Sequence, residues 1–160
     1  VYTTGYTGLT FYGGVWYYVT NGVLDWSVTT LTNYYDVWYY VENGTINWNY
    51  TGLCEYYGGF YHIANGVIDW SYSGLSPYNG GWYYVENGVY TNATVLCDYE
   101  GTVYFVENGA VNFNFTGFVQ LQEYYLFVEN GIWNTYFTGT VELIDGTICY
   151  VEEGVLVGME

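Results

Sequence analysis

The chain has no lysine and no arginine, so its 16 aspartates and glutamates give a net charge of −16 at neutral pH. Nucleic acids and anionic membrane surfaces are bound by basic side chains, and the composition therefore excludes both partners. No apolar run reaches the roughly 18 to 20 residues of a membrane-spanning helix, and no charged-then-apolar signal segment opens the chain. We expect no membrane insertion.

Cysteine, histidine and proline are also scarce, with three, one and one residue respectively. Three cysteines do not make a disulfide-built scaffold. Cys54 and Cys97 occupy the same position two repeats apart, about 10 Å at strand-like stacking, which is too far for a disulfide bond. We therefore expect three free thiols.

Residues that usually carry catalysis are nearly absent. His62 has no serine, cysteine or metal-ligand companions, and a lone histidine is more often packed than catalytic. Asp25 and Asp69 are equivalent positions of a repeat, so their environments should be alike, whereas an acid and a base need unlike environments. We predict no catalytic residue, no enzyme activity and no organic cofactor.

Aromatic residues and glycine dominate what remains, with 24 Tyr, 8 Phe and 7 Trp beside 22 Gly. This mixture favours pleated strands joined by tight turns. The sequence repeats about every 22 residues, and the first anchor of the repeat reads Trp-Tyr-Tyr-Val-Thr-Asn-Gly at residues 16–22. Seven anchors begin near residues 16, 38, 60, 82, 103, 125 and 148.

The first six anchors end in Asn-Gly, the strongest short-range signal for a two-residue hairpin turn. We expect a second strand after this turn, as in residues 67–75, and then a corner such as Gly58-Gly59 that leads into the next repeat. A lone hairpin is marginal in water, so neighbouring units must cover one another's aromatic faces. The predicted fold is an elongated, all-β tandem β-hairpin solenoid with about 22 residues per repeat and seven anchors.

We expect one repeat array over residues 1–160, with a half-repeat at 1–9 and a degenerate partial repeat at 148–160. The two ends would then carry complementary halves of one unit. Heterologous contacts of that kind build open filaments. The edges expected to self-assemble are Val1, Thr3, Gly5, Tyr6, Ile148, Tyr150, Val151, Val155 and Val157. The alternative is that both ends are cut points in a longer array.

The anchor, followed by Asp-Trp-Ser-Tyr-Ser-Gly-Leu at residues 69–75, resembles the short aromatic repeats of secreted Gram-positive surface proteins. It is similar to choline-binding and glucan-binding repeats, to the carbohydrate-binding repeats of large clostridial toxins, and to WYYVENG-type arrays, over residues 6–154. The resemblance implies a β-hairpin solenoid outside the cell or on its surface, often attached to glycan or cell wall through aromatic pockets. Choline-binding repeats build a cation cage with a Gly-Trp pair. The matching place here reads Gly-Leu, which argues against choline recognition.

A column of aromatic residues, four positions after each hairpin glycine, could bind sugar rings through their flat faces. The glycan-binding candidates are Trp26, Trp48, Trp70 and Phe113, together with the anchor tryptophans Trp16, Trp38 and Trp82. The alternative is a core ladder of stacked rings, and the general rule that periodic apolar positions are buried favours the ladder.

One repeat position, just before Asn-Gly, is acidic at Glu42, Glu86, Glu107 and Glu129. Stacked in register, these side chains form an acidic row, and like charges directly opposite each other are destabilising. Calcium would relieve the row because it takes carboxylate oxygens. The alternative is a solvated turn edge that discourages unwanted strand pairing, and the absence of an Asp-rich calcium motif favours that alternative.

The first functional hypothesis is a non-catalytic extracellular structural or adhesive protein that pairs with copies of itself, head to tail, into a surface fibre. The second is a glycan- or cell-wall-binding module that anchors a larger secreted protein, with cell-wall or host glycans as partners. An enzyme has the least support.

Overall fold

The computed structural model describes residues 5–160, so Val1 and Thr3 of the expected assembly edge lie outside the described residues. The regular secondary structure of residues 5–160 consists of 21 β-strands. This stretch contains no helical segment with the length and apolar character that a membrane crossing requires. The predicted all-β fold of tandem hairpins with a repeat of about 22 residues is confirmed.

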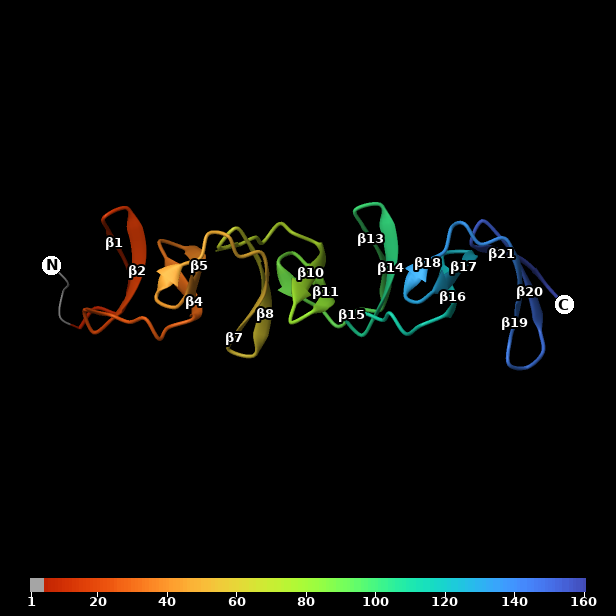
Figure 1. Cartoon of the computed structure of the whole chain (residues 1–160), viewed down its shortest axis with the longest axis horizontal. Helices are drawn as coiled ribbons and strands as arrows, with labels where there is room; N and C mark the ends of the chain where they lie inside the picture. Colours follow the sequence, from red (N-terminus) through yellow and green to blue (C-terminus); the bar gives the residue numbers. More distant parts are fainter. Residues whose placement is uncertain (1–4) are drawn as a thin grey trace. The chain divides into compact units, whose positions relative to one another are not determined.

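The chain divides into two compact units, one ending at Thr91 and one from Asn92 to Glu160. The long hairpins of the first unit are β1 (Gly8–Tyr12) with β2 (Val15–Thr20), β4 (Thr30–Tyr34) with β5 (Val37–Glu42), β7 (Gly52–Tyr56) with β8 (Gly59–Ala64), and β10 (Gly74–Tyr78) with β11 (Gly81–Glu86). Those of the second unit are β13 (Val95–Tyr99) with β14 (Thr102–Glu107), β16 (Gly117–Leu121) with β17 (Tyr124–Glu129), and β19 (Gly139–Glu142) with β20 (Ile148–Glu152). All are antiparallel and follow one another in chain order within each unit (Figure 1).

A short strand follows each long hairpin. These strands are β3 (Val23–Leu24), β6 (Thr45–Ile46), β9 (Val67–Ile68) and β12 (Val89–Tyr90) in the first unit, and β15 (Ala110–Val111), β18 (Ile132–Trp133) and the longer β21 (Val155–Met159) in the second. Each short strand pairs with the long strand before it and most also form one bridge to the preceding repeat, as Thr45 does opposite Tyr17. The repeats of a unit are thereby joined through main-chain contacts.

The expected strand over residues 67–75 is not continuous. It breaks after β9, because the Asp69 carboxylate accepts hydrogen bonds from the Ser71 backbone N–H (2.9 Å) and hydroxyl (2.6 Å) and turns the chain. The next strand, β10, belongs to the following hairpin. The predicted corner is therefore the tip of a long hairpin, where Tyr57 (φ 48°) and Gly58 (φ 80°) join β7 to β8.

The glycine of each Asn-Gly turn holds two repeats together. At Asn65-Gly66 both residues have positive φ, as a type I′ turn requires. The Gly66 N–H donates to the carbonyl of Tyr50, and the Gly66 carbonyl accepts from the N–H of Tyr40 in the preceding repeat. A Cβ at Gly66 would lie 2.7 Å from the carbonyl oxygen of Asn47. The same glycine position approaches backbone in this way at Gly44, Gly88, Gly131 and Gly154.

The core of each repeat is small. One β-branched residue of each anchor strand is almost fully buried, as at Val41 and Ile63, and so is a leucine of the partner strand in the first unit, as at Leu53. The predicted free thiols are confirmed at Cys54, Cys97 and Cys149, all buried. Burial, with a smaller contribution from Glu55, raises the pKa of Cys54 to about 11, so this thiol is protonated and unreactive near neutral pH.

Replacing Gly66 by alanine should destabilise the protein much more than replacing Gly58. Both residues have φ near 80°, but a Cβ at Gly58 meets no atom within 4 Å. We expect Gly58→Ala to lower the free energy of unfolding by about 1 kcal/mol. Gly66→Ala should cost roughly 2 kcal/mol more, because the backbone of the preceding repeat must move.

Urea unfolding of the two variants measures this difference. An equal decrease in the free energy of unfolding for Gly66→Ala and Gly58→Ala would contradict a role of the Asn-Gly turn in joining the repeats.

Candidate functional site

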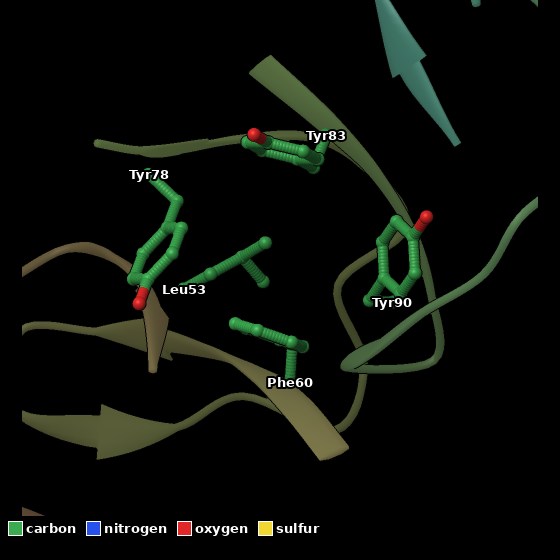
Figure 2. Close-up of a pocket in the computed structure, with 5 residues that line it drawn as sticks. All are labelled: Leu53, Phe60, Tyr78, Tyr83 and Tyr90. Carbon is green, nitrogen blue, oxygen red and sulfur yellow. The ribbon is translucent and has the colours of Figure 1, made fainter. Parts of the chain in front are cut away.

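Four aromatic rings surround a pocket in the first unit (Figure 2). Its lining residues are Leu53 on β7, Phe60 on β8, Tyr78 on β10, Tyr83 on β11 and Tyr90 on β12, so two successive hairpins and the following short strand each contribute a wall. We call this set the third box, because two similar sets of residues precede it along the chain. Leu53 is 1% exposed and forms its floor, while the four rings are half-buried and line its sides.

The rings of the third box contact one another in a closed circuit. Their centroids are 5.4 Å apart for Phe60 and Tyr78, 6.3 Å for Tyr78 and Tyr83, 6.2 Å for Tyr83 and Tyr90, and 6.2 Å for Tyr90 and Phe60. All four contacts are edge-to-face, with interplanar angles between 69° and 73°. Each ring is thus held by two neighbours, and the box is formed before any ligand enters.

The shape and lining of the third box suit a methylated ammonium group. Its cavity of about 170 Å³ is comparable with the roughly 150 Å³ apolar cavity that holds a benzene molecule. Aromatic faces attract cations through their quadrupole, and cages of such faces recognise quaternary ammonium groups. The chain carries no lysine or arginine that would compete for these rings.

The same box recurs one repeat earlier. The second box, a cavity of about 110 Å³, is lined by Leu31, Trp38, Tyr56, Tyr61, Ile68 and Trp70. Trp38 and Tyr56 lie 5.2 Å apart, and Tyr61 and Trp70 lie 5.8 Å apart. One repeat earlier again, the corresponding side chains Leu9, Trp16, Tyr34, Tyr39 and Ile46 pack together as the first box.

In the second unit the matching positions are largely aliphatic. Leu121 ends β16 where Tyr78 ends β10, and Leu126 on β17 stands where Tyr83 stands on β11. Trp133 keeps an aromatic ring at the position of Tyr90, and Tyr124 is a second aromatic residue in the lining of this pocket. This pocket therefore has two aromatic walls, where the third box has four.

The structure separates the predicted glycan-binding residues into two groups. Trp26, Trp48, Trp70 and Phe113 are 58, 47, 49 and 46% exposed, so the expected core ladder is wrong. Each packs edge-on against an anchor tyrosine or its equivalent, as Trp48 does on Tyr39 at 5.9 Å. Trp16 and Trp38 are half-buried walls of the first and second boxes, and Trp82 lies half-buried on β11.

Sequence reasoning missed most walls of the boxes. Tyr34, Tyr56 and Tyr78 end the first strand of their hairpins, and their period of 22 residues was the available signal. Tyr39, Tyr61 and Tyr83 are the second residue of the Trp-Tyr-Tyr or Phe-Tyr-His anchors. The signal for Tyr90 was weaker, because isoleucine occupies its position in the two preceding boxes.

The expected assembly edges are partly paired within the chain. Ile148, Tyr150 and Val151 lie on β20, which has β19 on one side and β21 on the other. Val155 and Val157 belong to β21, and Val155 also pairs with Leu126. At the other end the Tyr6 carbonyl accepts the N–H of Gly22 at 2.7 Å, while Gly5, also in the expected edge, has φ 90°. The self-assembly hypothesis stays a prediction.

Each carboxylate of the acidic row accepts a hydrogen bond from a neutral donor of its own repeat. Glu42 accepts a hydrogen bond from the side-chain amide of Asn47 at 2.7 Å, and Glu107 and Glu129 accept equivalent bonds from Asn112 and Asn134. Glu86 accepts one from the Tyr84 hydroxyl at 3.2 Å. Where a neutral residue replaces the glutamate, as at Thr20, its partner is the acid Asp25. Among residues 5–160 no three His, Cys, Asp or Glu side chains gather into a metal site, and the calcium hypothesis stays a prediction.

The pairing of one acid with one neutral donor in each repeat predicts that Asn47→Asp destabilises the protein. The new carboxylate would lie against Glu42, and the free energy of unfolding at pH 7 should fall by about 1 to 3 kcal/mol. Adding Glu42→Thr recreates the Thr20 and Asp25 pair of the preceding repeat and should restore stability. Thermal unfolding of the single and double variants tests this, and an unchanged midpoint for Asn47→Asp would contradict it.

His62 is a buried structural residue at 4% exposure, as expected of a packed histidine. Its Nδ1 lies 2.7 Å from the Ser76 hydroxyl, and its ring stacks on Tyr72 at 3.9 Å. Burial lowers the pKa of His62, while the charge of Asp69 opposes this shift. The hydrogen bond links β8 and β10, which carry Phe60 and Tyr78 of the third box.

Because the folded state keeps His62 neutral, the unfolded chain binds more protons as pH falls below about 6.5. The contribution of His62 to stability is therefore complete above that pH and is lost as pH falls through the folded pKa. The double variant His62→Tyr with Ser76→Cys copies the Tyr40 and Cys54 pair of the preceding repeat. Urea unfolding between pH 5 and 7.5 should show a smaller pH dependence for this variant, and identical pH dependence would contradict the assignment.

Comparison with known proteins gives a family match to this chain. The choline-binding repeat model matches residues 5–25, 27–47, 49–69 and 71–89, together just over half of the sequence. The search of curated proteins gave no match.

Among solved structures, choline binding protein F from Streptococcus pneumoniae, in the presence of a peptidoglycan analogue (tetrasaccharide-pentapeptide), is 21% identical with a TM-score of 0.37. The alignment covers 95% of this chain and 52% of that one. CbpF in complex with ipratropium is 20% identical with a TM-score of 0.36, over 95% of this chain and 54% of that one. The chain spans about half the length of these structures.

Proposed function

The chain belongs to the choline-binding repeat family, and from this premise we propose that it is a non-catalytic module that binds quaternary ammonium groups of a cell-wall ligand in its aromatic boxes. The observation that carries the proposal is the closed circuit of four rings in the third box. We place the module outside the cell, on its surface, as the family resemblance implies.

The Gly-Leu departure from the choline-binding pattern is compatible with this function. Leu53 and its equivalents Leu9 and Leu31 are 1 to 2% exposed and lie beneath the rings rather than among them. The walls come from other positions, so the leucines set the depth of each box while the aromatic rings supply the attraction for a cation.

Glycan binding is a second candidate function, and the exposed tryptophans support it. Trp26, Trp48 and Trp70 present about half of their surface to solvent, and Trp70 also borders the second box. A ligand whose ammonium group enters a box could therefore rest a sugar ring on the neighbouring tryptophan. Self-association into a fibre has no observation in residues 5–160 that favours it over binding.

Calorimetric titration with choline tests the proposal, with the neutral isostere 3,3-dimethylbutan-1-ol as the comparison ligand. Choline should bind at least roughly twofold more tightly, because a cation–π contact contributes about 0.5 to 2 kcal/mol. Tyr83→Ala removes one wall of the third box and should weaken choline binding there. Tyr136→Ala, at a tyrosine that is 96% exposed and outside the boxes, should leave it unchanged.

Equal affinity for choline and the isostere would show an apolar pocket without cation recognition. No binding of choline at millimolar concentration would overturn the proposed function.

A further inference from the structure

An exposed glutamate is paired with one wall residue of the third box, and the residue at the corresponding place in the other two boxes is uncharged. Glu55 lies directly opposite Phe60 in the register of β7 and β8. Residues directly opposite each other in an antiparallel pair project from the same face, with Cβ atoms about 5 Å apart. The equivalent residue is Asn33 opposite Trp38 in the second box and Phe11 opposite Trp16 in the first.

The carboxylate of Glu55 is held in place by a hydrogen bond, and no basic residue neutralises its charge. Its Oε1 accepts a hydrogen bond from the backbone N–H of Gly58 at 2.8 Å, which holds the carboxylate near the tip of the hairpin. In the second box the amide oxygen of Asn33 makes the corresponding contact, accepting from the N–H of Asp36 at 3.3 Å. The two side chains therefore have similar geometry but different charge, and the chain contains no lysine or arginine to pair with Glu55.

Tyr90 is the second feature peculiar to the third box. Its ring contacts both Phe60 and Tyr83 at 6.2 Å and closes the circuit. The second box has Ile68 at this position, 7% exposed, and takes its fourth ring from Trp70, whose contact is with Tyr61. The third box thus has four rings that contact one another in sequence.

We propose that Glu55 and Tyr90 make the third box the cation-selective site of the first unit, with the second box less selective for charge. The inference rests on the proposed function and specifies where it is carried out. A quaternary ammonium group in the third box would be surrounded by four rings, with Glu55 as the strand residue paired with Phe60. A ligand in the second box meets aromatic and aliphatic surface with an uncharged amide at the same place.

The test is calorimetric titration of the full chain with choline and with 3,3-dimethylbutan-1-ol at low ionic strength. Glu55→Gln keeps the hydrogen-bond acceptor and removes the charge, and it should weaken choline binding roughly two- to fivefold without affecting the neutral isostere. Tyr90→Ile copies the second box and should weaken choline binding roughly three- to thirtyfold. Tyr90→Phe keeps the ring and should retain most of the choline affinity, while Tyr136→Ala, outside the boxes, serves as the control variant.

Asn33→Glu is the reciprocal variant, which places the carboxylate of the third box beside Trp38 of the second. It should strengthen choline binding in the second box, where quenching of Trp38 and Trp70 fluorescence reports occupancy. Choline binding that is unchanged in Glu55→Gln and Tyr90→Ile would overturn the inference and leave the proposed function standing. No choline binding by the unmodified chain would overturn both.

Discussion

The contact on which the rest of the structure depends is the approach of the Asn-Gly glycines, such as Gly44 and Gly66, to the backbone of the preceding repeat. At Gly66 the N–H and the carbonyl are both hydrogen-bonded across this contact, and a side chain would meet the Asn47 carbonyl oxygen. This close packing fixes the distance between successive hairpins. Because each box takes walls from two of them, the same distance fixes how far apart the aromatic rings stand.

The absence of basic residues imposes a second constraint. With 16 carboxylates and no Lys or Arg, ordinary ion pairs cannot stabilise the fold, and the chain uses neutral donors in their place. The Asn47 amide and the Thr20 hydroxyl each bind one carboxylate of their own repeat. Hydrogen bonds also lower the pKa of Asp25 and of Asp69. Asp25 and Asp69 therefore stay ionised at neutral pH, and the net charge of −16 gives the chain an unbalanced negative field.

Much of the fold was predictable because Asn-Gly determines a local conformation. The two positive φ values at Asn43 and Gly44 follow from residue type alone, and the spacing of such turns gives the repeat. The break after Ile68 was not predictable in the same way, since the sequence of residues 67–75 is compatible with a strand until Asp69 bonds to Ser71. Because a continuous strand over residues 67–75 leaves the next Gly-rich turn between repeats, the sequence predicts a corner at the position where the structure has the tip of a long hairpin.

The candidate site was only partly predictable. Trp16 and Trp38 were identified from their place in the anchor, but the tyrosines that face them come from the next hairpin, and which positions meet depends on the register of both hairpins. Periodicity alone could not show that Trp26 and Trp48 are exposed, because solvent-facing and buried columns recur with the same period.

The sharing of walls between successive repeats bears on how such an array evolves. In the first unit Tyr61 belongs to the second box, while Phe60 beside it on β8 belongs to the third. Duplication of one 22-residue segment therefore adds a whole aromatic box without requiring a new interface. Linked copies of a weak site raise the overall avidity for a polymeric ligand by orders of magnitude. On the proposed function, recombination between repeats changes the number of boxes and with it the avidity for a repetitive polymer.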